Sequence, residues 1–279
     1  MRVNQVSSKF DYSEKISVSA VDKAAFLAFA GKAAKAAGAV TLPYFRANVA
    51  VENKLSNGKF DPVTEADKAA ERVIRDELAK EFPTHGIYGE EYGYTSGNGL
   101  TWVIDPIDGT RAFMSGMLHW GVLLALFDGE TPIVGAMYQP YTDELFLGDC
   151  DQAEMIRGST RRILKTSVCE TLGDAVLAST GVEWFEQDDR LNFERLKSNV
   201  KLCRFGGDCY LYGAVALGTV DIGTDASLNP YDIQALIPIV QGAGGVVTTY
   251  DGSNPSMGGA VVATANEVLH ELALERLNS

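Results

Sequence analysis

Three acidic clusters along the chain have the residue types and spacing needed to bind a metal ion. Two follow short apolar segments and the third opens a predicted helix: Gly89-Glu90-Glu91, Asp105-Pro106-Ile107-Asp108-Gly109-Thr110 and Asn229-Pro230-Tyr231-Asp232. Hard divalent cations such as Mg²⁺ prefer oxygen ligands, and a site made of a few carboxylates leaves positions open for water and a substrate phosphate. Together the clusters favour metal-assisted phosphate chemistry, whereas a Glu-Glu pair or an Asp-Gly-Thr turn on its own is usually solvated surface.

The middle cluster combines candidate metal ligands with a candidate phosphate site. Asp105 and Asp108 lie three residues apart across a proline-stiffened turn, so both carboxylates and the carbonyl group of Ile107 could face one point. The chain then passes Gly109 and reaches Thr110, where a short helix is expected to begin. Exposed backbone N–H groups at the start of a helix can bind phosphate. This combination is suited to phosphoryl hydrolysis.

The helices expected before these clusters have recognisable start and stop signals. An Ala-rich stretch predicts a helix over 21–45 with Ser19 as its N-cap. Thr64 and Asp67 have capping-box-like spacing before a second helix that ends at Pro83.

The remaining pattern predicts antiparallel strands first and an α/β arrangement afterwards. Residues 119–147 are expected to form consecutive strands with turns at Asp128-Gly129 and Thr142-Asp143. The later strands are expected at 175–179, 200–205, 220–224, 246–249 and 260–263, and the later helices at 186–198, 208–217, 230–241 and 266–277. We therefore expect a polar N-terminal arm over 1–18 and a single domain over 19–279, with an antiparallel-rich half (19–150) and an α/β half (151–279).

Composition limits the classes of partner. The 279 residues include 24 Lys and Arg against 37 Asp and Glu, which gives a net charge of −13. Such a chain repels nucleic-acid backbones and anionic lipid, so neither partner is expected. It would also repel a phosphorylated substrate unless metal ions reversed the local field. Because no secretory signal, membrane-length apolar run or close cysteine pair occurs, a cytoplasmic protein is expected.

The order of the motifs resembles that of the inositol monophosphatase family, from about residue 20 to the C-terminus. The segments that carry the resemblance are Asp61-Pro62-Val63-Thr64-Glu65-Ala66-Asp67, Gly89-Glu90-Glu91, Trp102-Val103-Ile104-Asp105-Pro106-Ile107-Asp108-Gly109-Thr110, Pro230-Tyr231-Asp232 and Gly242-Ala243-Gly244-Gly245. The resemblance implies a Mg²⁺-dependent, lithium-sensitive phosphomonoesterase that is usually dimeric. It also implies the αβαβα layered fold of the inositol monophosphatase and fructose-1,6-bisphosphatase type.

By position, the resemblance implies two or three metal ions in each active site. Glu90, Asp105 and the Ile107 carbonyl would bind the first ion. Asp105, Asp108 and Asp232 would bind the second, and Glu90 could share a weaker third.

The resemblance also implies the phosphate-binding and catalytic residues. Asp108, Gly109 and Thr110 would hold the phosphate. Asp67 would hydrogen-bond to Thr110 and, together with Glu90, would orient and deprotonate a metal-bound water. Thr110, Asp67 and Glu90 are thus the expected catalytic residues.

Other positions resemble the histidinol-phosphate phosphatase branch of the family. These are the Gly206-Gly207-Asp208-Cys209-Tyr210 run and the segment from Asp108 to Phe113. Asp225 lies where the family commonly has a substrate-contacting glutamate. Together with Asp208, it would suit a cationic amino alcohol better than a neutral polyol. Asp208 could instead cap a helix.

The expected substrate is therefore L-histidinol phosphate, an intermediate of histidine biosynthesis, and the expected assembly is a homodimer. The alternatives are myo-inositol monophosphate, a related sugar phosphate or a nucleotide 3′,5′-bisphosphate. A protein that keeps the fold but acts by binding a partner is less consistent with an intact set of metal ligands.

Three further residues have a structural interpretation at this point. Cys209 is expected to be a buried helix residue rather than a nucleophile, and Trp184 a core or subunit-contact residue. His270 is expected on the surface of the last helix.

Overall fold

The computed structural model describes residue 10 and residues 14–47, 52–53, 62–63 and 65–279. Thr64, and with it the expected capping contact to Asp67, lies outside the described residues. Among the described residues, no helix has the length and apolarity required to span a bilayer.

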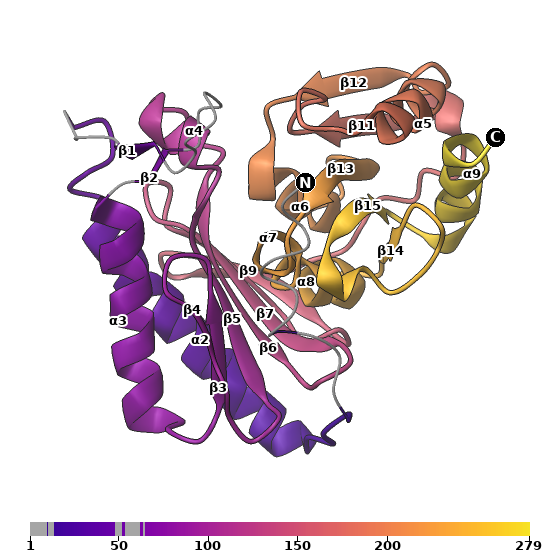
Figure 1. Cartoon of the computed structure of the whole chain (residues 1–279). Helices are drawn as coiled ribbons and strands as arrows, with labels where there is room; N and C mark the ends of the chain where they lie inside the picture. The colour runs from indigo at the N-terminus through magenta and orange to yellow at the C-terminus, as the bar shows by residue number, and fades with distance from the viewer. Residues whose placement is uncertain (1–9, 11–13, 48–51, 54–61, 64) are drawn as a thin grey trace.

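An eight-stranded sheet is built from the first part of the chain (Figure 1). Its strands are β3 (Gly86–Gly89), β4 (Gly93–Thr95), β5 (Thr101–Asp108), β6 (Gly121–Phe127), β7 (Pro132–Gln139), β8 (Glu144–Gly148), β9 (Ala153–Arg157) and β10 (Thr160–Ile163). Their order in the sheet is β10-β9-β8-β7-β6-β5-β3-β4, and every neighbouring pair is antiparallel except β3 and β5. The β9–β10 hairpin continues this sheet beyond residue 150, so the change from one sheet to the next comes after Ile163.

Both faces of this sheet are covered, which explains the uninterrupted apolar sequence of β6. Val122, Leu124 and Leu126 face helices α2 (Ala20–Thr41) and α3 (Glu65–Glu81). Leu123 and Ala125 face the opposite way, into the core formed with the second half of the chain. Side chains alternate between the two faces of a strand, and here both faces are buried.

The N-terminal helix depends on small residues to approach the sheet. A Cβ on Gly38 would lie 2.6 Å from the Tyr138 ring, so the backbone of α2 contacts that ring directly. Ser19 accepts a hydrogen bond of 3.2 Å from the backbone N–H of Asp22, which confirms it as the N-cap. The helix ends at Thr41, four residues earlier than expected.

A five-stranded sheet in the order β12-β11-β13-β15-β14 forms the second half. Its strands are β11 (Val176–Ser179), β12 (Leu202–Phe205), β13 (Ile222–Leu228), β14 (Val246–Thr249) and β15 (Gly259–Thr264). Helices α6 (Asp208–Ala216), α7 (Pro230–Ile233) and α8 (Leu236–Gly242) lie between the sheets, and α5 (Gln187–Lys197) and α9 (Glu267–Leu277) lie on the outer side. The expected αβαβα layering is therefore confirmed.

Short elements complete the chain, and two expectations need correction. The short elements are β1 (Glu52–Asn53), β2 (Pro62–Val63), α4 (Thr110–Met114) and the 3₁₀ turns η1 (Leu172–Asp174) and η2 (Pro255–Met257). The helix expected over 230–241 is two helices, separated at Gln234. His270 is on the buried side of α9 rather than on the surface, and hydrogen bonds with Thr248 and Thr264 satisfy its two ring nitrogens there.

Candidate active site

A β-bulge at the end of β5 turns two of the predicted metal ligands toward the same side. Asp105 pairs with Leu123 and Asp108 with Gly121, so β5 contains one more residue than β6 between these pairs. In a regular strand, residues three apart face opposite sides of the sheet. The extra residue removes that opposition. The strand thus runs through to Asp108, and the turn expected between the two aspartates is a bulge instead.

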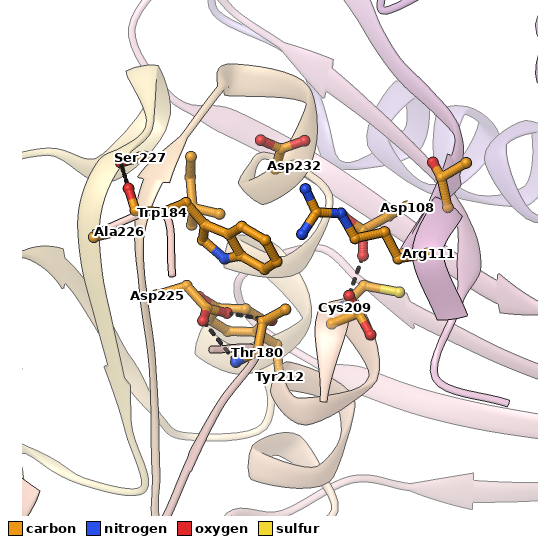
Figure 2. A pocket seen from close by; sticks show the side chains of 14 residues that line it. Asp108, Arg111, Thr180, Trp184, Cys209, Tyr212, Asp225, Ala226, Ser227 and Asp232 are labelled. Atoms are coloured by element: carbon orange, nitrogen blue, oxygen red, sulfur yellow. Dashed lines mark hydrogen bonds between the residues drawn. The ribbon is translucent and has the colours of Figure 1, made fainter. Parts of the chain in front are cut away.

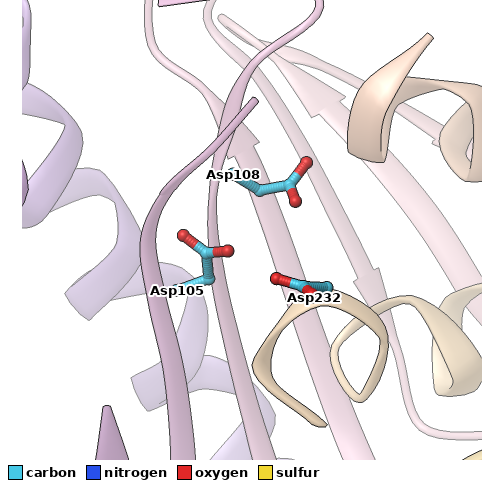
Figure 3. Close-up of side chains that lie close together, drawn as sticks. All are labelled: Asp105, Asp108 and Asp232. Atoms are coloured by element: carbon cyan, nitrogen blue, oxygen red, sulfur yellow. The ribbon is translucent and has the colours of Figure 1, made fainter. Parts of the chain in front are cut away.

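The third carboxylate comes from the other half of the chain. Asp232 lies in α7, where its Oδ2 accepts hydrogen bonds from the backbone N–H of Asn229 (2.6 Å) and from the side-chain amide of the same residue (3.2 Å). This capping box fixes the side chain of Asp232. One carboxylate oxygen from each of Asp105, Asp108 and Asp232 lies within 4.8 Å of the other two (Figure 3).

The electrostatics of this triad favour a cation. Burial raises the pKa of Asp105 well above its usual value, and the charges of Glu90, Asp108 and Asp232 raise it further. Burial and the charge of Asp232 likewise raise the pKa of Asp108, opposed by hydrogen bonding to Cys209, whose backbone N–H donates at 2.7 Å. Three buried or half-buried carboxylates, with only oxygen donors, form a set that fits a hard divalent cation.

Glu90 directly follows β3, the strand that pairs with β5 next to the triad. Gly89 pairs with Ile104 in the parallel β3–β5 ladder, and the backbone N–H of Glu90 donates to the Ile104 carbonyl at 3.2 Å. The backbone of Glu90 therefore lies beside that of Asp105, and the charge of Glu90 raises the Asp105 pKa. Its carboxylate is outside the group of three whose oxygens lie within 4.8 Å.

Asp67 approaches the same cluster from α3. It lies in the first turn of that helix, is 1 % exposed, and adds to the raised pKa of Asp105. Thr110 Oγ1 donates to the Ile107 carbonyl at 3.1 Å, so the hydroxyl and the carbonyl that were assigned to catalysis and metal binding contact each other. Donation from Thr110 to Asp67 stays a prediction.

Gly109 occupies a conformation that few other residues could adopt. Its φ of 78° is left-handed, and an added Cβ would lie 2.9 Å from the His119 carbonyl oxygen and 3.0 Å from the Asp208 side chain. The chain turns at this glycine into α4, which begins at Thr110. The predicted phosphate-binding residues are thereby brought to the wall of a cavity.

This cavity has a volume of about 240 Å³ and is lined from both halves of the chain (Figure 2). Asp108, Gly109 and Thr110 contribute one side, whereas Asp208, Asp225 and Asp232 come from the second half. The volume is below the roughly 300 Å³ at which pockets for drug-sized ligands begin. A small molecule is therefore the suitable ligand.

Of the two predicted substrate residues, Asp225 is the one whose carboxylate accepts several hydrogen bonds from the protein itself. Asp225 Oδ1 accepts from the backbone N–H of Thr180 (2.7 Å) and the hydroxyl of Ser179 (3.0 Å), and Oδ2 accepts from the Thr180 hydroxyl (3.0 Å). Burial raises the Asp225 pKa to about 7 against these hydrogen bonds. The contacts join β13 to the end of β11 and hold Asp225 in the cavity wall, where its contact with a substrate stays a prediction.

Asp208 is not the helix cap that was one of its two interpretations. The N-cap of α6 is Gly207, and Asp208 is the first helical residue, with a left-handed φ of 41°. Burial raises its pKa to about 6, opposed by the charge of Arg111. Asp208 lines the cavity beside the end of β5, and its contact with a substrate stays a prediction.

Two further residues, Arg111 and Trp184, line the cavity and were not predicted to do so. The Arg111 guanidinium carbon lies 3.9 Å from the centre of the Trp184 ring, and both side chains line the cavity. Trp184 follows β11, and its carbonyl accepts a 2.8 Å hydrogen bond from Ser227. Trp184 also packs against the core around Phe193, as expected, and its place in the cavity wall is an addition to that expectation. In the sequence, the one local indication of this pair is that Arg111 directly follows the Asp108-Gly109-Thr110 segment.

Comparison with known proteins agrees with this architecture. The family model for the inositol monophosphatase family matches residues 22–279. The bifunctional phosphatase IMPL2, chloroplastic, of Arabidopsis thaliana is 33% identical over 264 residues, covering 90% of this chain and 75% of that protein. A histidinol-phosphatase of Chlorobaculum parvum is 33% identical over 238 residues, covering 85% of this chain and 90% of that protein.

A solved structure gives the same result. An inositol monophosphatase from Zymomonas mobilis has a TM-score of 0.82 at 33% identity, covering 94% of this chain and 100% of that chain. The similarity in sequence and in fold extends over nearly the whole chain. The protein therefore belongs to the inositol monophosphatase family and is a phosphatase that hydrolyses phosphate monoesters.

Proposed function

We propose that the protein hydrolyses L-histidinol phosphate to L-histidinol and phosphate, with Mg²⁺ as the metal. The choice of this substrate rests on the position of Asp208, whose carboxylate lines the cavity beside the acidic triad. A carboxylate in that position favours a leaving alcohol with a positive charge. Relatives named histidinol-phosphatase support the same choice.

The proposed mechanism assigns a task to each group around the triad. Asp105, Asp108, Asp232 and Glu90, with the Ile107 carbonyl, would hold two or three Mg²⁺ ions. Bound ions of this kind lower the pKa of water and neutralise charge on phosphate. The acidic triad cannot bind an anionic ester unaided, because its carboxylates repel one.

The remaining residues would orient the substrate and move the proton. The backbone N–H groups of Gly109 and Thr110 would bind the phosphate oxygens, and Glu90 and Asp67 would orient the attacking water and accept its proton. Asp208 would bind the ammonium group of the leaving alcohol. We also propose a homodimer, as the resemblance implies, and a role in histidine biosynthesis in the cytoplasm, as the sequence composition favours.

The proposal is tested by measuring phosphate release with Mg²⁺ from L-histidinol phosphate and from myo-inositol 1-phosphate. We expect kcat/KM to favour histidinol phosphate by about 100-fold, equivalent to about 2.7 kcal/mol. A preference for inositol phosphate would instead support the second candidate, which the similarity to the Zymomonas mobilis inositol monophosphatase favours.

The pH dependence of this preference offers an independent prediction. The raised pKa of Asp208, about 6, means that its carboxylate is charged at pH 7.5 and mostly neutral at pH 5. The preference for histidinol phosphate should therefore fall as the pH decreases through 6. Titration of the phosphate affects both substrates, and the Asp208→Asn variant controls for titration of the imidazole, because its preference should lack this step. A wild-type preference that is constant from pH 5 to 7.5 would contradict the role of Asp208.

A further inference from the structure

The buried carboxylate of Glu71 is not part of the proposed chemistry, yet it lies next to the segment that carries Glu90. It is 0 % exposed and projects from α3, one turn after Asp67. Glu71 Oε2 accepts a hydrogen bond from the backbone N–H of Glu91 at 2.7 Å, and Oε1 accepts one from the N–H of Tyr92 at 3.2 Å. These are the two residues that follow Glu90.

A basic residue completes this arrangement. Arg75, one turn further along α3, donates from Nε to Glu71 Oε1 at 2.7 Å. Its Nη2 donates to the carbonyl of Gly93 at 2.5 Å, on the far side of the same turn. The charge of Glu71 is thus balanced, and the turn between β3 and β4 is held at both ends by a single helix.

The close approach of Glu71 requires a glycine in β3. A Cβ on Gly89 would lie 2.0 Å from Glu71 Oε1, so any larger residue would displace the carboxylate from the turn. On the other side, Glu90 is joined to β5 through its N–H bond to the Ile104 carbonyl. The segment is therefore fixed between α3 and the strand that carries Asp105.

We propose that Glu71, held by Arg75, is a positioning residue that fixes Glu90 beside Asp105 for metal binding. The inference rests on the proposed role of Glu90 as a metal ligand, but not on the identity of the substrate. Buried hydrogen-bond partners of ligand-bearing segments set the orientation of the ligands, and their loss typically weakens metal affinity by 10- to 100-fold.

The test is Mn²⁺ binding to the full-length protein without substrate, measured by calorimetry and electron paramagnetic resonance. We expect Glu71→Gln to weaken Mn²⁺ binding at least about tenfold. The required Mg²⁺ concentration for half-maximal activity should rise by the same factor. Asp128→Asn is the matched control, because Asp128 is also buried, accepts two backbone N–H bonds in a turn and lies near a lysine. Asp128 follows the end of β6 that is remote from Asp108, so the Mn²⁺ affinity of Asp128→Asn should stay within about twofold of the wild-type value.

A double-mutant cycle separates positioning from general destabilisation. If Glu71 acts through Glu90, Glu71→Gln should weaken Mn²⁺ binding in the wild type and have no further effect in a Glu90→Gln background. Equal weakening in both backgrounds, or none in either, would overturn the inference. Unchanged Mn²⁺ binding by the Glu90→Gln variant would also overturn the inference, because the inference requires Glu90 to be a metal ligand.

Gly89→Ala provides a second route if Glu71→Gln does not fold. It displaces the Glu71 carboxylate without changing any charge, and it should give the same loss in the same cycle. A substrate other than histidinol phosphate would contradict the proposed function but leave these binding results unaffected.

Discussion

Asp105→Asn is expected to lower kcat by at least about 10³-fold, equivalent to about 4 kcal/mol in the activation barrier. Asp105 is 2 % exposed, lies within 4.8 Å of two other carboxylates, and is assigned to both principal metal ions. Asparagine keeps the shape and can still accept the 3.1 Å hydrogen bond from the Ile107 N–H, so only the charge is lost. The measurement is steady-state phosphate release over a range of Mg²⁺ concentrations.

Thermal stability gives this variant a second readout. The folded pKa of Asp105 is raised above its unfolded value, so its ionisation disfavours the folded state once the pH exceeds the unfolded pKa. Asp105→Asn removes that cost, and the metal-free variant should melt at or above the wild-type temperature at pH 7.5. Mg²⁺ should raise the melting temperature of the wild type and have little effect on the variant. Near-normal turnover would refute the metal assignment.

Asp208→Ala is expected to lower kcat/KM for L-histidinol phosphate by about 100-fold while changing that for myo-inositol 1-phosphate by less than about threefold. Truncating one partner of a desolvated charge pair typically costs about 2–5 kcal/mol, and a neutral polyol has no such pair to lose. The loss should appear mainly in KM, because in the proposed mechanism Asp208 would contact the leaving alcohol rather than the reacting phosphate. Kinetics with both substrates on the same preparation provide the comparison.

The isosteric variant identifies the physical origin of that effect. Asp208→Asn keeps the volume and a hydrogen-bond acceptor, so it should behave like alanine if charge is what matters. Equal losses on both substrates would show that the residue supports α6 or the cavity wall instead. Melting temperatures of both variants control for the favourable position of an acidic side chain in the first helical turn.

Local sequence signals predicted many of the elements that frame the site. These elements depend on residues that are close together in the sequence, so a single sequence reveals them. They include the apolar strand β6, the Ser19 cap of α2 and the alternating strands and helices after Ile163. The hairpin of β9 and β10 was not predicted, because its exposed edge strand (Thr160–Ile163) lacks an apolar face.

The sequence by itself determined which acidic residues are present, the order of their motifs and the membership of a phosphatase family. Only the tertiary structure decided how these residues face one another. The bulge that turns Asp105 and Asp108 to one side, the approach of Asp232 from the other half, and the packing of Arg111 on Trp184 all depend on contacts between distant segments. Such contacts leave no trace in local periodicity, because they are fixed by the packing of one sheet and its helices against the other.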